Sequence, residues 1–169
     1  SVILFGSEYP TVLRGSLRTR YALQADTIDV VNAGVPGEAA GNPATLTRFS
    51  SAISGRQAVL IMEGSNDLYT AYSGGSGFTD AAIANIRTMV QRAKTANVKP
   101  FLATVPPMNP QACTPICRGF AAGLVGPFND RIRLLASAEG ATLVDVHKAF
   151  NGDFALLDQR LGNLWMDSG

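Results

Sequence analysis

Asn66 and Asp67 are the residues whose position in the sequence most suggests chemistry. They come shortly after an unbroken apolar run, Val59 to Met62, with Glu-Gly-Ser between. Such a run is typical of a strand buried on both faces of a parallel sheet. Ligands of open α/β sheets bind just beyond the carboxyl ends of the strands, so this amide and carboxylate stand where a ligand would bind. An ordinary turn is the alternative, because Gly, Ser, Asn and Asp dominate turns.

Two further polar segments, Gly6-Ser7 and Asn32 to Glu38, also follow short apolar runs. The second contains two glycines and a proline, which predict a tight turn whose backbone N–H groups point into the crevice. A plain helix start explains the same residues equally well. In a parallel sheet the carboxyl ends of all strands share one rim, so we expect these segments to lie near Asn66.

The composition limits the classes of protein and partner. Of the 169 residues, 46% are hydrophobic and 16% charged, which predicts a globular chain with a sizeable core, organised as one domain over residues 1–169. The net charge of +1 gives no electrostatic reason to expect nucleic acid or an anionic membrane as partner. No apolar run approaches the roughly 18 residues of a membrane span, so we expect no integral membrane segment.

Strand and helix patterns alternate along the chain. Apolar runs predict five strands, at Val2–Phe5, Ile28–Val31, Ala58–Met62, Pro100–Val105 and Thr142–Val146. Helical spacing predicts helices between them, at Tyr9–Gln24, around Phe49, from an N-cap at Thr79 or Asp80 to Ala93, and around Ile132. Parallel strands need helical crossovers, so the fold class is α/β, a three-layer α/β/α sandwich with a five-stranded parallel sheet, flavodoxin-like in arrangement.

The same segments resemble a known family. Val30–Glu38 and Glu63–Leu68 resemble the second and third sequence blocks of the SGNH (GDSL-type) esterases and lipases. Tyr9–Leu13 is similar to the Tyr/Trp-Pro-x-x-Leu helix that follows the nucleophile loop of that family. Its later strand-helix-strand pattern is matched by Phe101–Pro107, Phe128–Arg133 and Leu143–Val146. The resemblance spans essentially the whole chain and implies an SGNH-hydrolase-like fold.

The resemblance also implies a mechanism. In that family a serine attacks an ester carbonyl, a histidine is the general base, and an aspartate shortly before it orients the histidine. The oxyanion is held by the serine N–H, a glycine N–H and an asparagine amide, each donor being worth about 2.7–4 kcal/mol in the transition state. Carried over by motif, the glycine is Gly37 and the asparagine is Asn66. Both lie at strand ends, from which an amide and a backbone N–H can converge on one oxygen.

The nucleophile segment departs from the family pattern. The family has Gly-Asp-Ser and then a loop before the Tyr-Pro helix, whereas Ser7 is followed almost directly by Tyr9 and Pro10. Either Ser7 is the nucleophile in a shortened loop, or Ser7 merely precedes the helix and the Gly-Asp-Ser segment is missing. The short distance to Tyr9 favours a domain that is incomplete around residues 6–9.

The C-terminal motif also departs. The Asp-x-x-His of the family would begin at Asp167, so we expect Asp167 to orient the base and the histidine to lie beyond Gly169, in a domain incomplete at this end. The one histidine, His147, follows the fifth expected strand, where the family requires no catalytic group. We expect His147 to be a surface or helix-start residue and Asp145 to cap the segment after it.

These observations favour a carboxylic ester hydrolase that acts on a small-molecule, carbohydrate or lipid ester with a short acyl or acetyl group. Residues 72–77 and 106–115 are expected to flank the acyl pocket. A non-catalytic α/β binding module derived from this fold is one alternative. The other is a flavodoxin-like phosphate or nucleotide binder that uses Gly34–Glu38 at a helix N-terminus. It is weaker, because Gly-x-x-x-x-Gly-Lys and Gly-x-Gly-x-x-Gly are absent and Glu38 disfavours an anion.

Cys113 and Cys117 stand in Cys-Thr-Pro-Ile-Cys. Because His147 is distant in sequence and no second cysteine pair exists, we expect no metal site, and no motif predicts a cofactor. Two interpretations of this pair are open: a local disulfide, which requires an oxidising compartment, and two free thiols. The first slightly favours a secreted or periplasmic location.

Overall fold

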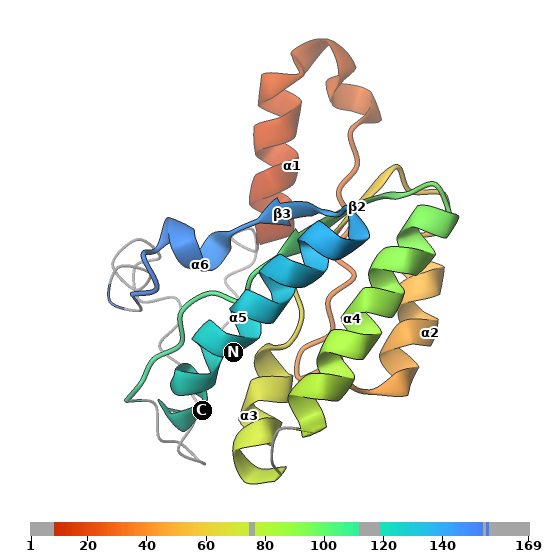
Figure 1. Cartoon of the computed structure of the whole chain (residues 1–169). Helices are drawn as coiled ribbons and strands as arrows, with labels where there is room; N and C mark the ends of the chain where they lie inside the picture. Colours follow the sequence, from red (N-terminus) through yellow and green to blue (C-terminus); the bar gives the residue numbers. More distant parts are fainter. Residues whose placement is uncertain (1–8, 75–76, 112–118, 154, 156–169) are drawn as a thin grey trace. The chain divides into compact units, whose positions relative to one another are not determined.

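The computed structural model in Figure 1 describes residues 9–74, 77–111, 119–153 and 155. The chain divides into two compact units, one of residues 1–36 with 167–169 and one of residues 37–166. The single domain expected over residues 1–169 remains a prediction.

The first unit contains α1 (Tyr9–Arg20) and a 3-10 helix, η1 (Ala22–Thr27). We expected one helix to Gln24, but the Gln24 N–H donates to the Tyr21 carbonyl, 2.9 Å away, and so makes a bond of the 3-10 type. The α-helix therefore ends before the predicted boundary.

The strand expected at Ile28–Val31 is wrong, because these residues form no strand and pair with no strand among the described residues. The Ile28 N–H donates to the Ala25 carbonyl at 3.2 Å, and the Ile28 carbonyl accepts from Arg18 Nε at 3.1 Å. Both backbone groups of Ile28 are thus used locally and not in a sheet ladder. The strand expected at Val2–Phe5 lies outside the described residues.

The second unit carries the sheet. Its elements are α2 (Pro43–Ala52), β1 (Ala58–Ile61), α3 (Ser65–Gly74), α4 (Gly77–Thr95), β2 (Lys99–Ala103), α5 (Gly119–Glu139), β3 (Thr142–Val144) and α6 (Val146–Ala149). The strands are parallel in the order β1-β2-β3, with Leu60 opposite Phe101 and Phe101 opposite Thr142. The parallel α/β fold is confirmed, but the described residues form three strands and not five.

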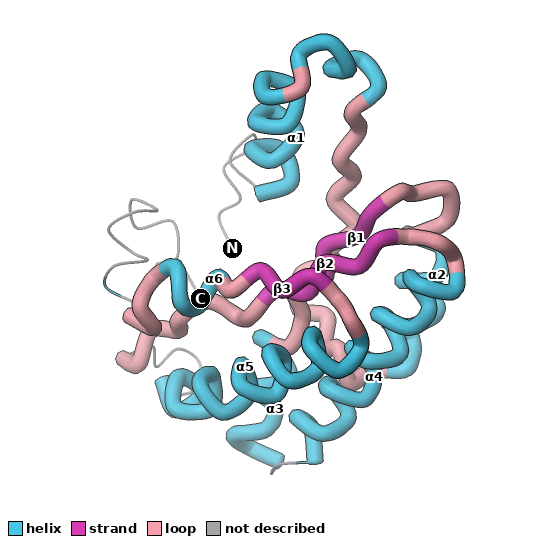
Figure 2. The backbone as a smooth tube through the Cα atoms, turned by 45° about the horizontal axis from the view of Figure 1, so that its top comes forward, coloured by secondary structure: helices cyan, strands magenta, loops and turns pink. Residues whose placement is uncertain are grey.

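Helices α2, α3, α4 and α5 lie on one face of this sheet (Figure 2). The connection through α4 leads from β1 to β2, and the connection through α5 leads from β2 to β3, so both run in the same direction across the sheet. Two connections of the same handedness that run in the same direction place their helices on the same face of the sheet. In its described part this unit has a sheet layer and a helical layer. The third layer of the expected sandwich stays a prediction.

The core lies between that sheet face and the helices. The apolar stripes expected on the two long helices are buried, and they pack with Ile61 of β1 and Leu102 of β2. The stripe of α4 consists of Ile83, Ile86, Met89, Val90 and Ala93, and that of α5 consists of Phe128, Ile132, Leu135 and Ala136. The periodicity is confirmed, but the cap of α4 is not. Because α4 begins at Gly77, Thr79 and Asp80 lie in its first turn.

Candidate active site

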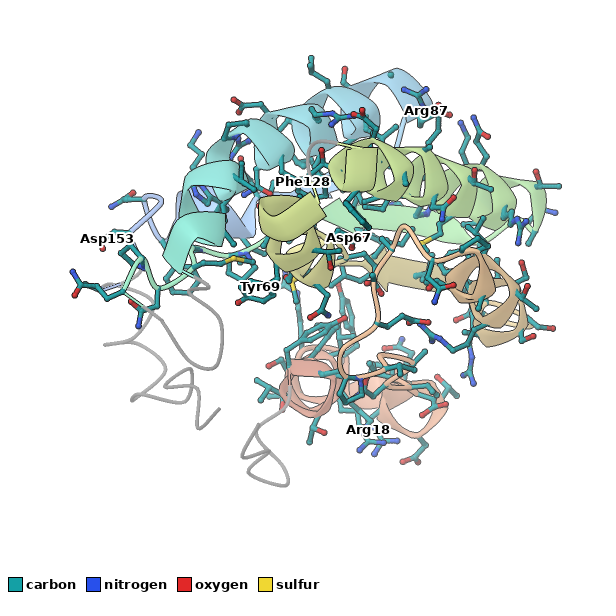
Figure 3. The ribbon with its side chains drawn as sticks, turned by 90° about the horizontal axis from the view of Figure 1, so that it is seen from below. Arg18, Asp67, Tyr69, Arg87, Phe128 and Asp153 are labelled. Atoms are coloured by element: carbon teal, nitrogen blue, oxygen red, sulfur yellow. The ribbon has the colours of Figure 1, made fainter. Side chains whose placement is uncertain are left out.

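Gly64 shapes the chain between β1 and α3. Its φ is +115°, a conformation that side chains disfavour, and a Cβ on it would lie 2.4 Å from ring carbons of Phe128. Figure 3 labels Phe128, a residue of α5, and Asp67, a residue of α3. Directly after this glycine, Ser65, Asn66 and Asp67 form the first turn of α3, which the sequence reading missed. The apolar spacing of Leu68 and Ala71, both buried, was the available signal.

Asn66 and Gly37, which the family motifs pair, lie together. Asn66 Nδ2 donates to the carbonyl of Glu38, the residue after Gly37, at 2.8 Å. A side-chain amide carries two N–H donors, so this bond uses one of them. Gly37 has a φ of +77°, which suits glycine in a tight turn. The structure therefore brings the amide and the turn together from segments far apart in sequence.

Asp67 holds the same turn through two short hydrogen bonds. Its Oδ2 accepts from the Ala40 N–H at 2.8 Å and its Oδ1 from the Gly41 N–H at 2.7 Å. From α4, Asn85 Nδ2 donates to the Ala40 carbonyl at 2.8 Å. Residues 37–41, here called the glycine turn, are thus attached to both α3 and α4. The helical pattern of α4 gave no signal for the role of Asn85.

Charged side chains lie in the glycine turn and beside it. Glu38 forms an ion pair with Arg48 of α2, and the hydrogen bond from Arg48 lowers the pKa of Glu38. Burial, reinforced by the charge of Glu38, raises the pKa of Glu63 to about 7, although Arg48 opposes the shift. Sequence reasoning did not single out Glu63, yet a carboxylate directly after an apolar strand is a recognisable signal for a perturbed group.

The phosphate-binding alternative loses support from this geometry. The backbone N–H groups of Ala40 and Gly41 donate to Asp67, and that of Ala44 donates to the N-cap side chain of Asn42 at 3.0 Å. These are the donors that a phosphate at the start of α2 would require. These N–H groups already donate to protein acceptors, and the carboxylate of Asp67 beside them would repel a phosphate.

A second polar cluster joins the ends of β2 and β3. Asp145 caps α6 by accepting from the Lys148 N–H at 3.1 Å, and it also accepts from Arg133 Nε at 2.9 Å. The hydrogen bond from Arg133 is the main cause that lowers the pKa of Asp145 to about 2. The backbone N–H of His147 donates to Thr104 Oγ1 at 2.9 Å. The expected capping role of Asp145 and the helix-start position of His147 are confirmed.

A cavity of about 540 Å³ lies beside this cluster. Its walls come from residues 107–111, from α5 and from the segment 147–155. The first of these belongs to a loop that we expected to flank the acyl pocket. In the other expected loop, residues 72–74 are the last residues of α3. Ser7, Asp167, Cys113 and Cys117 lie outside the described residues.

Comparison with known proteins decides the family. A model of the GDSL-like lipase/acylhydrolase family matches residues 5–164. The chain belongs to this family. Membership supports the hydrolysis of small-molecule esters as its class of reaction. A search of curated proteins found no match.

Solved structures agree with this GDSL-family assignment at the level of the fold. The acetyl xylan esterase AlAXEase has a TM-score of 0.65 at 21% identity, over 94% of this chain and 78% of that chain. AlinE4, an SGNH-hydrolase family esterase, has a TM-score of 0.60 at 20% identity, over 89% of this chain and 71% of that chain. The fold is therefore the α/β fold of the SGNH hydrolases.

Neither a membrane-spanning helix nor a metal-binding cluster occurs in residues 9–74, 77–111, 119–153 and 155. Within those ranges, no helix has the length and apolar character needed to cross a membrane. Nor do His, Cys, Asp and Glu side chains there form a group of three or more able to hold a metal ion.

Proposed function

We propose that this protein is a serine-dependent carboxylic ester hydrolase in which Gly37 and Asn66 supply two arms of the oxyanion hole. The bond of 2.8 Å from Asn66 Nδ2 to the Glu38 carbonyl carries the proposal, because it holds the amide against the residue that follows Gly37. The second N–H of Asn66 and the backbone N–H of Gly37 then bind the oxygen that becomes negative during the reaction.

The reaction has two steps. The serine hydroxyl oxygen attacks the ester carbonyl carbon as a histidine takes its proton, and the alcohol leaves with that proton when its C–O bond breaks. Water, losing a proton to the same histidine, then attacks the acyl-enzyme, releasing the acid and restoring the serine. From the family resemblance alone, we assign the orienting carboxylate to Asp167. The nucleophile and the third oxyanion N–H come either from Ser7 or from the serine of a Gly-Asp-Ser segment missing around residues 6–9. The histidine is left unassigned.

We assign the acyl group of the ester to the cavity beside residues 107–111. Its volume of about 540 Å³ falls within the usual range for small-molecule sites. Pro107, Met108 and Val125 give it apolar walls, and Val125 lies one turn of α5 before Phe128, the residue that packs on Gly64. These features support an apolar acyl group at this site, and the short acyl or acetyl chain stays an expectation from the sequence.

Kinetics with p-nitrophenyl acetate and labelling by a fluorophosphonate test the proposal. Asn66→Ala should lower kcat roughly a hundredfold or more, because one oxyanion donor is lost. Asn97→Gly is the matched control: this exposed asparagine follows α4 at a φ of +57°, which glycine adopts without strain. It should keep the wild-type kcat.

Two results would count against the proposal. An unchanged kcat in Asn66→Ala would remove Asn66 from the mechanism. A wild-type protein that neither hydrolyses the ester nor reacts with the fluorophosphonate would favour the non-catalytic binding module.

A further inference from the structure

We propose that Asp67 is a positioning residue for catalysis, which holds the glycine turn in the geometry that stabilises the transition state. This inference rests on the proposed function. It concerns a buried side chain that connects the turn carrying Gly37 to the helix carrying Asn66.

The hydrogen bonds of Asp67 are directed away from its own helix. A carboxylate in the first turn of a helix commonly serves that helix by offsetting its dipole or capping its free N–H groups. Here both carboxylate oxygens accept from another segment, from the Ala40 N–H at 2.8 Å and the Gly41 N–H at 2.7 Å. The side chain is 1% exposed, so these bonds are shielded from competing water. Charge-assisted bonds of this length are among the strong ones.

The glycine turn is shaped to receive this carboxylate. A Cβ on Gly41 would lie 3.0 Å from Asp67 Oδ1 and 3.4 Å from the Cβ of Ala81, so a larger residue would force the carboxylate or the turn to shift by a few tenths of an ångström. Gly41 has an ordinary φ, so its backbone conformation does not require glycine. The close approach of Asp67 explains why a glycine stands at this position. The pairing of a buried acceptor with a residue lacking a side chain fixes the distance between the turn and α3.

Side chains hold every peptide from residue 38 to residue 41. The Glu38 carbonyl accepts from Asn66, and the Ala39 carbonyl accepts from Thr45 Oγ1 at 3.0 Å. The Ala40 and Gly41 N–H groups donate to Asp67, and the Ala40 carbonyl accepts from Asn85. Such a turn is preorganised, which is the condition under which oxyanion donors are effective.

Asp67 and Asn66 are consecutive residues, so a change at Asp67 alters the separation between the Gly37 N–H and the Asn66 amide. A misplacement of about 1 Å in a catalytic group costs up to a hundredfold in rate. Asp67 is 1% exposed, so we expect the ester to make no contact with it and the ground-state binding of the ester to depend on other groups. We therefore expect a defect in kcat at nearly constant KM.

Asp67→Asn is the direct test, since it keeps the shape of the side chain but turns one acceptor into a donor that faces a backbone N–H. Roughly a 10- to 100-fold loss of kcat is expected, with KM of p-nitrophenyl acetate changed less than about threefold. Asp145→Asn is the control, because Asp145 also accepts a backbone N–H and joins separate segments. It should lower thermal stability while keeping kcat within about threefold of the wild type.

Gly41→Ala provides a second measurement if Asp67→Asn reduces the folded fraction. It leaves the carboxylate in place and displaces the turn, so we expect it too to lower kcat at nearly constant KM. A double variant separates positioning from general destabilisation. In the Asn66→Ala background, the additional loss caused by Asp67→Asn should shrink to less than about threefold, because the geometry that it disturbs is already lost.

The failures are distinguishable. A folded Asp67→Asn variant with the wild-type kcat, or losses that multiply fully in the double variant, would overturn the role of Asp67 while the esterase proposal stands. A wild-type protein without esterase activity or fluorophosphonate labelling would overturn both.

Discussion

Glu63 should make this protein less stable as the pH rises through neutrality, and Glu63→Gln should remove that dependence. Burial raises the pKa of Glu63 from 4.5 to about 7, so the folded protein favours the protonated carboxyl. The unfolded chain releases the proton at lower pH. Stability is then greatest below pH 4.5, falls as the pH rises towards 7, and stays reduced above that value.

The size of the effect follows from the two pKa values. At about 1.4 kcal/mol per pKa unit, ionisation of Glu63 lowers the free energy of unfolding by about 3 kcal/mol at alkaline pH. Integration of the two titration curves places about 2.5 kcal/mol of this loss between pH 5 and pH 8. Glutamine keeps the shape of the side chain without the charge. The free energy of unfolding of Glu63→Gln relative to the wild type should therefore rise by about 2.5 kcal/mol from pH 5 to pH 8.

Urea denaturation of both proteins at pH 5 and pH 8, followed by circular dichroism, measures this difference. Glu139→Gln is the control, because Glu139 is a carboxylate that pairs with Arg87 at the surface. We expect that control to show no gain in stability at pH 8. An equal difference between Glu63→Gln and the wild type at the two pH values would refute a buried, protonated Glu63.

Two further predictions concern the strand ends. Gly64→Ala should lower the free energy of unfolding by roughly 2–3 kcal/mol, since the new Cβ meets the Phe128 ring and the φ is positive; a loss below 1 kcal/mol in urea denaturation would contradict this reasoning. His147→Ala should react with the fluorophosphonate at a rate within about threefold of the wild type, because the family resemblance assigns no catalytic role to this position. Complete loss of labelling would instead identify His147 as the base.

The sequence determined the features that depend on local pattern. The stripes of α4 and α5 were predicted correctly, because the burial of a packed helix repeats with its own period. Gly37 and Asn66 were chosen from motif and residue type, and the structure brought them together. The sequence did not predict that Ser65 to Asp67 form the first turn of a helix, because polar residues that favour turns also favour the first turn of a helix.

Only the tertiary structure decided the features that depend on partners distant in sequence. Ile28–Val31 has the composition of a strand, but a strand exists only where another segment accepts its hydrogen bonds. The raised pKa of Glu63 depends on burial and on the charges of Glu38 and Arg48, which come from another part of the chain. In the sequence Asp67 is one more polar residue after a strand, whereas in the fold its carboxylate oxygens accept hydrogen bonds from the N–H groups of Ala40 and Gly41. Residue types supplied the catalytic candidates, and the packing of separate segments determined which side chains hold them in place.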